Sequence, residues 1–575
     1  MSMLNVGASA LITAQGSLST TSHNISNVNT EGYNRQIVEQ GTRLPNFEGG
    51  YYIGSGVNIT SVERRFDDFL ADQVRIFTSQ EQQLDTFSAF ARQVDDLLGA
   101  PELSLSSGLQ GFFNAVQDVA DDPTSIPARQ VMLTEADTLS QRFNTLDSQL
   151  TAFSEQVNSN LDTAIKDVNV ISAGIANLNK AITEALGGNG TPPNDLLDQR
   201  DRLINELSTY LSVTSIEQSN GSMNIFVGKG QGIVVGQSAI ELSVTTDPAD
   251  TSRFEVGYGP SNINISSQLT GGTVGGLLTV RQDVIDPARS EIDALAVGMI
   301  DNVNAQHTVG ITLSGNAGGN FFEPADPAIQ GAGSIRLAIT DPRDIAVAFP
   351  VVSSKSQTNT GTAGLEINTV TALSNPVAAQ AINSDITFSF DSVANSYTVS
   401  YQGETATLPY NPSTDSGKTF DMSTLVFSIT PPAVTAPTAP SMTITLTGVP
   451  VEADQFTMSN SVDGLGNFTA VGDNRNALEI GDLQIAKILN GNSESFGDSY
   501  GILVANVATR THQADVNQKT QKGLLEQTNL RYESVSGVNL DEEAASLIKY
   551  QQAYQAASQI ITVSNTVFNS LINAM

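Results

Sequence analysis

The sequence predicts a multidomain α + β protein whose body is a long-helix bundle with inserted antiparallel β domains. Three observations lead to this class. Near both chain ends, apolar residues recur every three or four positions, which places them on one helix face. Long tracts with the same period lie between residues 61 and 212. At Val213 the pattern changes to short alternating runs separated by Gly, which are typical of strands.

Composition limits the class of protein. The chain has 575 residues, which allows several domains with their own cores. Its 27 Lys and Arg residues against 60 Asp and Glu residues give a net charge of −33. Such a surface repels phosphate backbones and anionic lipids, so we expect neither nucleic acid binding nor membrane insertion. The absence of cysteine excludes disulfides and thiolate metal sites. No cleavable secretory signal is predicted, because no basic segment precedes an apolar core.

Residues 1–60 are predicted to hold an N-terminal axial helix, a motif and a loop. Leu4, Leu11, Leu18 and Ile25 supply one large aliphatic side chain per heptad, and small residues between them would let another helix approach closely. The Asn-rich segment 23–36 then ends the helix with turn residues. Residues 47–57 are rich in Gly and aromatic residues, so we expect a loop or hairpin there.

The helical body is predicted over residues 61–212, with helices at 66–98, 108–123, 127–186 and 194–211. A small β module follows at 213–274. Its GKGQG sequence has strands on both sides and is interpreted as a hairpin turn, because a dinucleotide-binding loop must open a helix. The helical body is expected to return at 275–309.

Residues 310–470 are rich in Thr, Ser, Gly and Pro, and we predict one or two outer β domains of sandwich type. The expected strands include ITFSF, YTVSYQ, LVFSIT and MTITLTGV. Spacing, surface cover and adhesion all remain open as roles for this region. The helical body is expected to return again at 471–536, beginning with NALEIGDLQIAKIL.

Residues 537–575 are predicted to form a C-terminal axial helix. Asn539 fits an N-cap, and Glu542 three residues later fits a capping box. The period alone fits a core helix or an assembly helix equally well. Because both chain ends carry it, we expect them to form a coiled-coil-like inner domain, packed on each other and on neighbouring copies, and mobile in a free monomer. The predicted C-terminal interface residues are Leu547, Tyr550, Tyr554, Ile561, Phe568 and Leu571.

No catalytic, cofactor-binding or metal-binding residues are predicted. His23, His307 and His512 lie far apart in the sequence, and none has a partner at a metal-ligand spacing. Pairs of acidic residues, such as Asp95 and Asp96, are interpreted as solvated helix faces. We therefore expect that the protein is not an enzyme.

The Asn-rich motif is similar to the N-terminal signature of the bacterial flagellar axial proteins, which include rod, hook and hook-associated proteins. The C-terminal stretch beginning GVNLDEEAASLIKYQQAYQ resembles the same group, and LLDQRDRLINELSTYL supports it. The ending GYNRQ resembles the hook-associated protein of the hook–filament junction, the FlgK family, more than hook protein. The signature residues are Asn24, Asn27, Asn29, Thr30, Gly32, Tyr33, Arg35 and Gln36.

This resemblance implies a structural subunit at the hook–filament junction that self-assembles through its terminal helices into a homo-oligomeric ring. It implies hook protein and the second junction protein as neighbours, and a FlgN-type export chaperone at the C-terminal helix. It also implies unfolded export by the flagellar type III system from the cytoplasm to the extracellular flagellum. Two alternatives remain: another axial protein, of the hook or distal rod, and an adhesin or enzyme carried by the β inserts.

Overall fold

The computed structural model describes residues 2–48, 50–189, 191–326, 331–371, 380–428, 437–463 and 465–574. The chain divides into two compact units. The first, which we call the terminal unit, contains residues 1–93, 152–285 and 508–575. The second, the central unit, contains residues 94–151 and 286–507. The helices α2 (Asp68–Gly99), α4 (Ile126–Asn189) and α11 (Phe496–Ser536) each contribute residues to both units.

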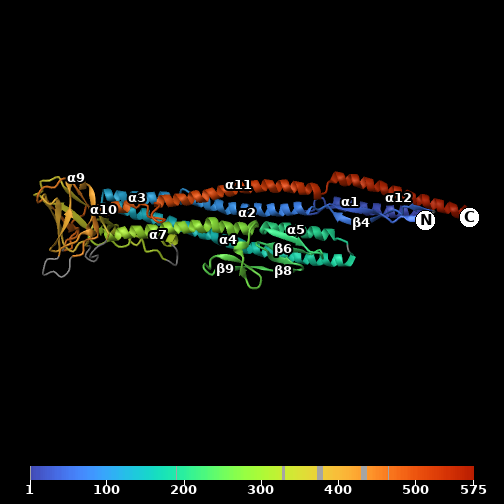
Figure 1. Cartoon of the computed structure of the whole chain (residues 1–575), viewed down its shortest axis with the longest axis horizontal. Coiled ribbons are helices and arrows are strands. Elements are labelled where there is room, and N and C mark those ends of the chain that lie inside the picture. The colour runs from blue at the N-terminus through green and yellow to red at the C-terminus, as the bar shows by residue number, and fades with distance from the viewer. Residues whose placement is uncertain are drawn as a thin grey trace. The chain divides into compact units, whose positions relative to one another are not determined.

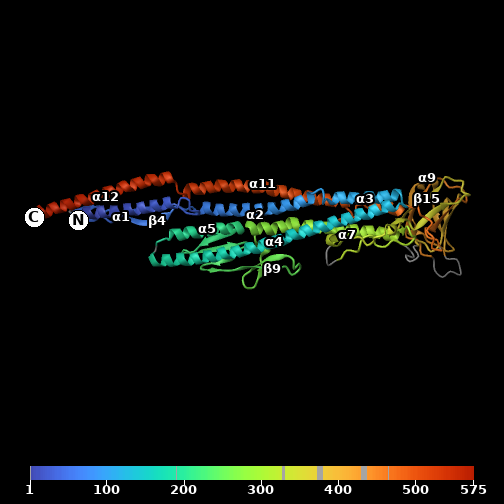
Figure 2. The ribbon, with the colours of Figure 1, turned by 180° about the vertical axis from the view of Figure 1, so that it is seen from behind.

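The two ends of the chain form a helix pair in the terminal unit. Helix α1 (Ser2–Ser26) and helix α12 (Leu540–Ala574) lie side by side, with the two termini at the same end of the pair (Figures 1 and 2). Gly7 permits this close approach, because a Cβ atom there would lie 3.0 Å from Cγ1 of Ile561 and 3.1 Å from Cγ2 of Ile560. The structure thus brings together the two helices that the heptad spacing predicted.

A two-stranded ribbon packs on α1. Its strands are β1 (Gln36–Thr42) and β4 (Val57–Arg64), antiparallel with a bulge between Glu39 and Gln40. Between them β2 (Asn46–Glu48) and β3 (Tyr51–Ile53) form a short hairpin, as predicted for residues 47–57. The ribbon covers the polar face of α1, where the hydroxyl of Ser9 accepts the Val57 N–H at 3.3 Å.

The small β module of the terminal unit consists of two antiparallel sheets. Strands β5 (Val213–Glu217), β6 (Met223–Val227), β7 (Gln231–Val235) and β8 (Ser238–Ala239) form the first in sequence order. Strands β9 (Leu242–Thr246), β10 (Phe254–Tyr258) and β11 (Ile263–Asn264) form the second, with β10 central. The GKGQG sequence connects β6 to β7, so the hairpin interpretation is confirmed.

The predicted helix over residues 275–309 is interrupted. Helix α6 (Gly272–Val280) passes into a π-helical turn (Arg281–Ile285) before α7 (Asp286–Val309) begins. The π turn places the Arg281 guanidinium in a buried ion pair, with Nη2 2.9 Å from Oε1 of Glu255 on β10. A sequence period does not reveal one extra residue in a helical turn, so the interruption was missed.

The central unit contains a β-sandwich. One sheet has the order β14 (Val351–Lys355), β21 (Gln455–Asn460), β16 (Ile386–Asp391), β17 (Ser396–Tyr401), β18 (Glu404–Pro409). The other has the order β15 (Gly364–Val370), β20 (Met442–Thr447), β19 (Lys418–Asp421). Alternating side chains of both sheets are buried between them and form one shared core, which includes Phe388, Tyr397 and Ile444. The short helix α9 (Pro412–Asp415) precedes β19.

Helices complete the central unit. They are α3 (Leu105–Asp121), α8 (Gly331–Ser334) and α10 (Arg475–Asp482), together with α7 and the adjoining parts of α2, α4 and α11. The short strands β12 (Ile311–Thr312) and β13 (Ala346–Ala348) pair with each other. Phe112 of α3 packs against Phe321 and Phe322, with ring centroids 5.9 and 6.2 Å away.

Two sequence predictions in the central unit were wrong. The described part of the LVFSIT run, residues 425–428, is irregular. Phe427 enters the sandwich core, and Ser428 bonds to the Thr405 carbonyl of β18 through its N–H and its hydroxyl. The helix predicted over NALEIGDLQIAKIL is too long, since α10 ends at Asp482. Beyond it the backbone hydrogen bonds join residues three apart, such as the Gln484 N–H to the Gly481 carbonyl, which is the pattern of a tightened final turn.

Candidate functional site

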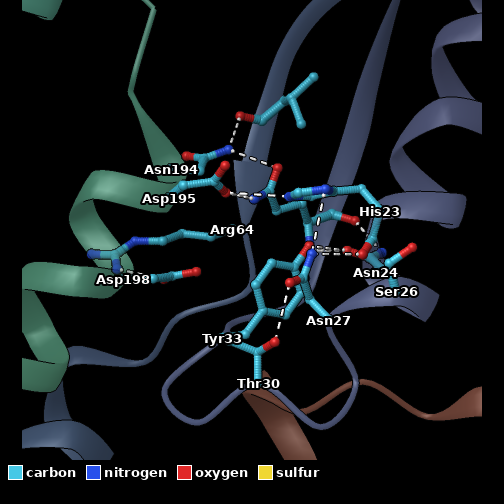
Figure 3. Close-up of polar contacts among 12 residues, drawn as sticks. His23, Asn24, Ser26, Asn27, Thr30, Tyr33, Arg64, Asn194, Asp195 and Asp198 are labelled. Carbon is cyan, nitrogen blue, oxygen red and sulfur yellow. Dashed lines mark hydrogen bonds and ion pairs between the residues drawn. The ribbon is translucent and has the colours of Figure 1, made fainter.

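Asn24, at the end of α1, is the centre of the signature segment (Figure 3). Its side chain is 1% exposed. Its Nδ2 donates to the Gln36 carbonyl at 2.9 Å and to Oε2 of Glu543 at 3.1 Å. Its Oδ1 accepts from the Tyr33 hydroxyl at 2.7 Å and from the Gln36 N–H at 3.0 Å. One amide thus joins α1, β1 and α12, and all of its hydrogen-bonding capacity is used.

Arg35 makes the second connection to α12. Its Nε donates to Oε1 of Glu543 at 2.7 Å and its Nη1 donates to Oε2 of Glu542 at 2.6 Å. Its backbone N–H donates to the Ser536 carbonyl at 2.9 Å, where α11 ends. Glu543 is 2% exposed and lies in the first turn of α12, where the helix dipole also favours a carboxylate.

The predicted capping box is wrong in one of its two parts. Oδ1 of Asn539 accepts the Asp541 N–H at 2.9 Å, so Asn539 is the N-cap. Glu542, however, bonds to Arg35 and not to the backbone N–H of Asn539. The Glu542 carboxylate lies beside the Arg35 guanidinium, and a charge-assisted hydrogen bond to that cation is stronger than a bond to a neutral backbone amide.

The signature also contacts the helix α5 (Asn194–Tyr210) and α11. Asn34 donates through its backbone N–H and its Nδ2 to the Asp198 carboxylate, at 3.1 and 2.7 Å, and accepts from the Tyr532 hydroxyl at 2.8 Å. Arg64 Nη1 bridges Asp198 and Asp201 at 3.0 and 2.5 Å. Burial raises the pKa of Asp198, and the bonds from Asn34 and Arg64 oppose that shift. Burial also raises the pKa of Tyr532 to about 12.

The turn that follows α1 is held by local bonds. Asn27 Nδ2 donates to the His23 carbonyl at 3.0 Å, and its Oδ1 accepts from the Thr30 hydroxyl at 3.1 Å (Figure 3). Gly32 has φ = +75°, and a Cβ atom there would lie 3.2 Å from Cβ of Arg202. Asn29 is exposed. Asn27, Thr30 and Gly32 therefore shape the turn that leads to Tyr33, Asn34 and Arg35.

Gln36 reaches α5 beside the same turn. Its Nε2 donates to Oδ1 of Asp195 at 2.9 Å, and Asn194 Nδ2 donates to the Val62 carbonyl at 2.8 Å. We call the group Asn24, Tyr33, Asn34, Arg35, Gln36, Asp198, Tyr532 and Glu543 the signature network. Sequence reasoning missed Asn34, Asp198 and Tyr532 as members, although Asp198 lies within the LLDQRDRL motif that supported the resemblance.

The predicted assembly residues divide into two groups. Leu11, Leu18, Ile25, Leu547, Tyr550 and Ile561 are partly buried. Leu4, Tyr554 and Phe568 are exposed by 41, 37 and 62%. Leu571 belongs to α12, but its side chain lies outside the part that the structure describes. The small residues Gly7, Ala14 and Ala557 are buried, as are the hydroxyl residues Ser9, Thr13, Ser17 and Thr21 of α1. The pair is thus closely packed through small residues and leaves large apolar side chains at its surface.

The histidines lie in different surroundings. His307 is fully buried in the central unit, where its ring nitrogens bond the Gly319 carbonyl and the Ala346 N–H. The ring nitrogens of His23 face Asp195 at 3.4 Å and Asn27 at 3.4 Å, so neither faces a nucleophilic hydroxyl.

Within the described ranges, no group of His, Asp and Glu residues could hold a metal ion. Among the helices of those ranges, none is long and apolar enough to cross a membrane.

The Tyr33→Phe variant should lose about 1 kcal/mol of unfolding free energy in the terminal unit. The reason is that Oδ1 of Asn24 then accepts one hydrogen bond, from the Gln36 N–H, and no longer accepts the bond from the Tyr33 hydroxyl. Burial, and then the carboxylates of Asp195, Asp198 and Glu543, raise the pKa of the Tyr33 phenol, so the hydroxyl is protonated and donates at neutral pH. Urea unfolding monitored by amide hydrogen exchange at Gln36 measures the change. Tyr51→Phe is the control, since Tyr51 is 76% exposed. Equal stability of the two variants would contradict a structural role for this bond.

Comparison with known proteins places this geometry in a family. A model described as the flagellar hook-associated protein FlgK helical domain matches residues 91–322. Models of the flagella basal body rod protein and of the flagellar basal body rod FlgEFG protein C-terminal region match residues 4–34 and 531–574. Over 577 aligned residues, the chain is 31% identical to flagellar hook-associated protein 1 of Salmonella typhimurium strain LT2, covering 100% of this chain and 99% of the relative. The chain belongs to the flagellar hook-associated protein 1 (FlgK) family.

Other members agree with this assignment. Flagellar hook-associated protein 1 of Escherichia coli K12 is 30% identical over 595 aligned residues, covering 100% of this chain and 99% of that protein. The structure of the hook junction protein FlgK from Burkholderia pseudomallei aligns with a TM-score of 0.69 at 24% identity, covering 81% of this chain and all of that one. It confirms the fold. This FlgK-family chain is a structural subunit of the flagellum at the hook–filament junction, as its sequence predicted.

Proposed function

We propose that this FlgK-family chain forms the hook–filament junction by self-assembly of α1 and α12 into a closed homo-oligomeric ring. The observation that carries the proposal is the buried Asn24–Glu543–Arg35 contact, which ties both terminal helices and the ribbon to one another. A pair held in this way can present a constant surface to its neighbours. Homo-oligomers with closed symmetry repeat one such surface around a ring.

The proposed contacts between copies use the apolar side chains that the pair leaves exposed. Besides Leu4, Tyr554 and Phe568, these include Val563 and Val567, which are 51 and 52% exposed. Burying such a side chain contributes roughly 1.5–3 kcal/mol. The cost of ordering two chain ends offsets part of this gain. In the free monomer, the parts of α1 and α12 beyond the signature network are therefore proposed to be mobile and to become ordered in the ring.

We infer that the ring lies between hook protein and the second junction protein, outside the cell. From Tyr550 to Met575 the sequence has no charged residue, and α12 exposes several apolar side chains in this half. Such a helix needs cover in the cytoplasm, which supports the proposal of a FlgN-type chaperone there before type III export.

A non-enzymatic role is supported by the surroundings of His23 and His307. The sandwich would then be an outer domain, and adhesion by it has no residue cluster in its favour among the described residues.

Two substitutions test the assembly proposal in flagellated cells that carry this chain. Ile561→Asp puts a charge against Gly7 in the helix pair, and Phe568→Asp puts one on its exposed surface. Both variants should give hooks without filaments and flagellin shed into the medium, as should Leu547→Asp. Electron microscopy of the cells and immunoblots of the medium provide the readouts.

A matched control is Ile263→Asp, which changes a side chain that is 60% exposed on β11 of the same unit. Cells with this control should carry normal filaments. Normal filaments on both the Ile561→Asp and the Phe568→Asp cells would refute assembly through the terminal helices. Deleting residues 1–30 and 537–575 should also abolish polymerisation, while any binding or catalytic activity of the β inserts would survive.

A further inference from the structure

The β2–β3 hairpin carries a cluster of exposed apolar side chains. Phe47, Tyr51 and Tyr52 are 65, 76 and 76% exposed, and Leu44 beside them is 88% exposed. The rings of Phe47 and Tyr52 lie across the hairpin with centroids 5.1 Å apart. Aromatic side chains gathered on a surface are typical of protein interfaces, where they bury a large area at small entropic cost. The signature network does not use any of these residues.

The hairpin lies at the end of the terminal helix pair where α1 begins and α12 ends. Asn24 bonds β1 at Gln36, Gln40 bonds Ser17, and Val57 bonds Ser9, so the ribbon runs back along α1 toward its N-terminus. The hairpin extends the ribbon beyond Ser9. On the other side of α1, Gly7 faces Ile561, so the last residues of α12 lie at this same end.

This end of the terminal unit carries few charges in a strongly acidic protein. The sequence has no Asp, Glu, Lys or Arg from Met1 to Thr30 and none from Tyr550 to Met575, and Glu48 is the only one from Leu44 to Gly56. Copies of a chain with a net charge of −33 repel one another through most of their surface. They can approach most closely through this end, which carries few charges. A lipid surface fits less well, because residues 1–60 contain only two cations, Arg35 and Arg43.

We propose that the β2–β3 hairpin docks on a second copy of this chain, with its aromatic side chains on the exposed apolar surface of the neighbour's α1–α12 pair. The proposed receiving residues are Ile12, which is 64% exposed on α1, and Val563 and Val567 on α12. The inference rests on the proposed assembly function and adds a specific contact to it. The terminal helices hold the copies together, and the hairpin connects each copy to the next.

Disulfide crosslinking tests the contact cleanly, because the natural chain has no cysteine. Cells should express two tagged full-length chains, one with Tyr52→Cys and the other with Ile12→Cys. With one cysteine per chain, a disulfide between the two tags forms only between copies. Oxidised, isolated flagella should contain this heterodimer. The pair of Tyr52→Cys with Ile263→Cys is the control and should not crosslink, since Ile263 lies in the small β module.

A second experiment removes the aromatic side chains while keeping strand-forming residues. The combined Phe47→Thr, Tyr51→Thr, Tyr52→Thr variant should reduce the number of filamented cells about tenfold. Its circular dichroism should be unchanged, because these side chains are exposed. Ile216→Thr with Ile263→Thr, two exposed strand positions at 49 and 60%, is the matched control and should give normal filaments.

The outcomes separate this inference from the assembly proposal. A heterodimer together with filament loss supports the hairpin contact. No heterodimer and normal filaments in the Thr variant overturn it, and the assembly proposal then stands if Ile561→Asp still abolishes filaments. If the Ile561→Asp and Phe568→Asp cells also carry normal filaments, both proposals fail. Flotation of the purified chain with phosphatidylcholine vesicles that depends on the hairpin, without crosslinking, would assign the hairpin to a lipid and overturn docking on a second copy.

Discussion

The Glu543→Ala variant is expected to lose about 4 kcal/mol of the free energy that holds α12 on the terminal unit. Glu543 is 2% exposed and pairs with Arg35 at 2.7 Å and with Asn24 at 3.1 Å. Removing one partner of a buried pair typically costs 3–5 kcal/mol, because the other group stays in place without compensation. Arg35 would keep only Glu542, and Asn24 would lose one acceptor. Amide hydrogen exchange along α12 should rise in the variant while that of α5 changes little.

Glu542→Ala is the matched control, one residue away in the same helical turn. Its carboxylate also bonds Arg35, at 2.6 Å, but the side chain is 59% exposed. Solvent screens such a pair, so we expect a loss below about 1 kcal/mol. Similar exchange rates in the two variants would contradict the assignment of Glu543 as the buried contact. Cells with Glu543→Ala should also lose filaments more severely than cells with Glu542→Ala.

The central unit is expected to lose about 3 kcal/mol of unfolding free energy as the pH falls from 6.5 toward 4. Full burial lowers the pKa of His307 from 6.5 to about 4. The unfolded chain therefore binds a proton in this range that the folded unit does not bind. Stability is fully present above pH 6.5 and falls by up to about 1.4 kcal/mol per pH unit below it.

The structure gives this titration a local readout. The Ala346 N–H donates to Nε2 of His307 at 2.9 Å, while Nδ1 faces the Gly319 carbonyl at 2.7 Å. A protonated ring cannot accept the Ala346 bond, so the protection factor of this amide, the ratio of the exchange rate in an unstructured chain at the same pH to its own rate, should fall first as the pH falls. The His307→Gln variant removes the titrating group and should show a flatter pH dependence between 6.5 and 5. An unchanged slope in that variant would assign the pH dependence to other groups.

Much of the architecture follows from local patterns. The 64-residue helix α4 was predicted to within a few residues, because an apolar period and the Pro residues near its start act locally. Strands such as β16 alternate buried and partly exposed side chains, so their sequence alone identifies them. The boundaries of the predicted domains remain a prediction. The errors at residues 425–428 and 483–489 occur where apolar residues lie in irregular structure, while those at the π turn and at Glu542 depend on contacts that the local pattern does not contain.

The sequence by itself determined that both chain ends are helices with matching apolar spacing, and that the Asn-rich signature follows the first of them. Only the tertiary structure decided how the signature acts. Asn24 and Glu543 are 519 residues apart, and Asn34 and Asp198 are 164 apart. No local rule selects Glu543 over Glu542 as the buried acid. The choice depends on which carboxylate the fold turns toward Asn24 and removes from water, where an unpaired charge would be too costly.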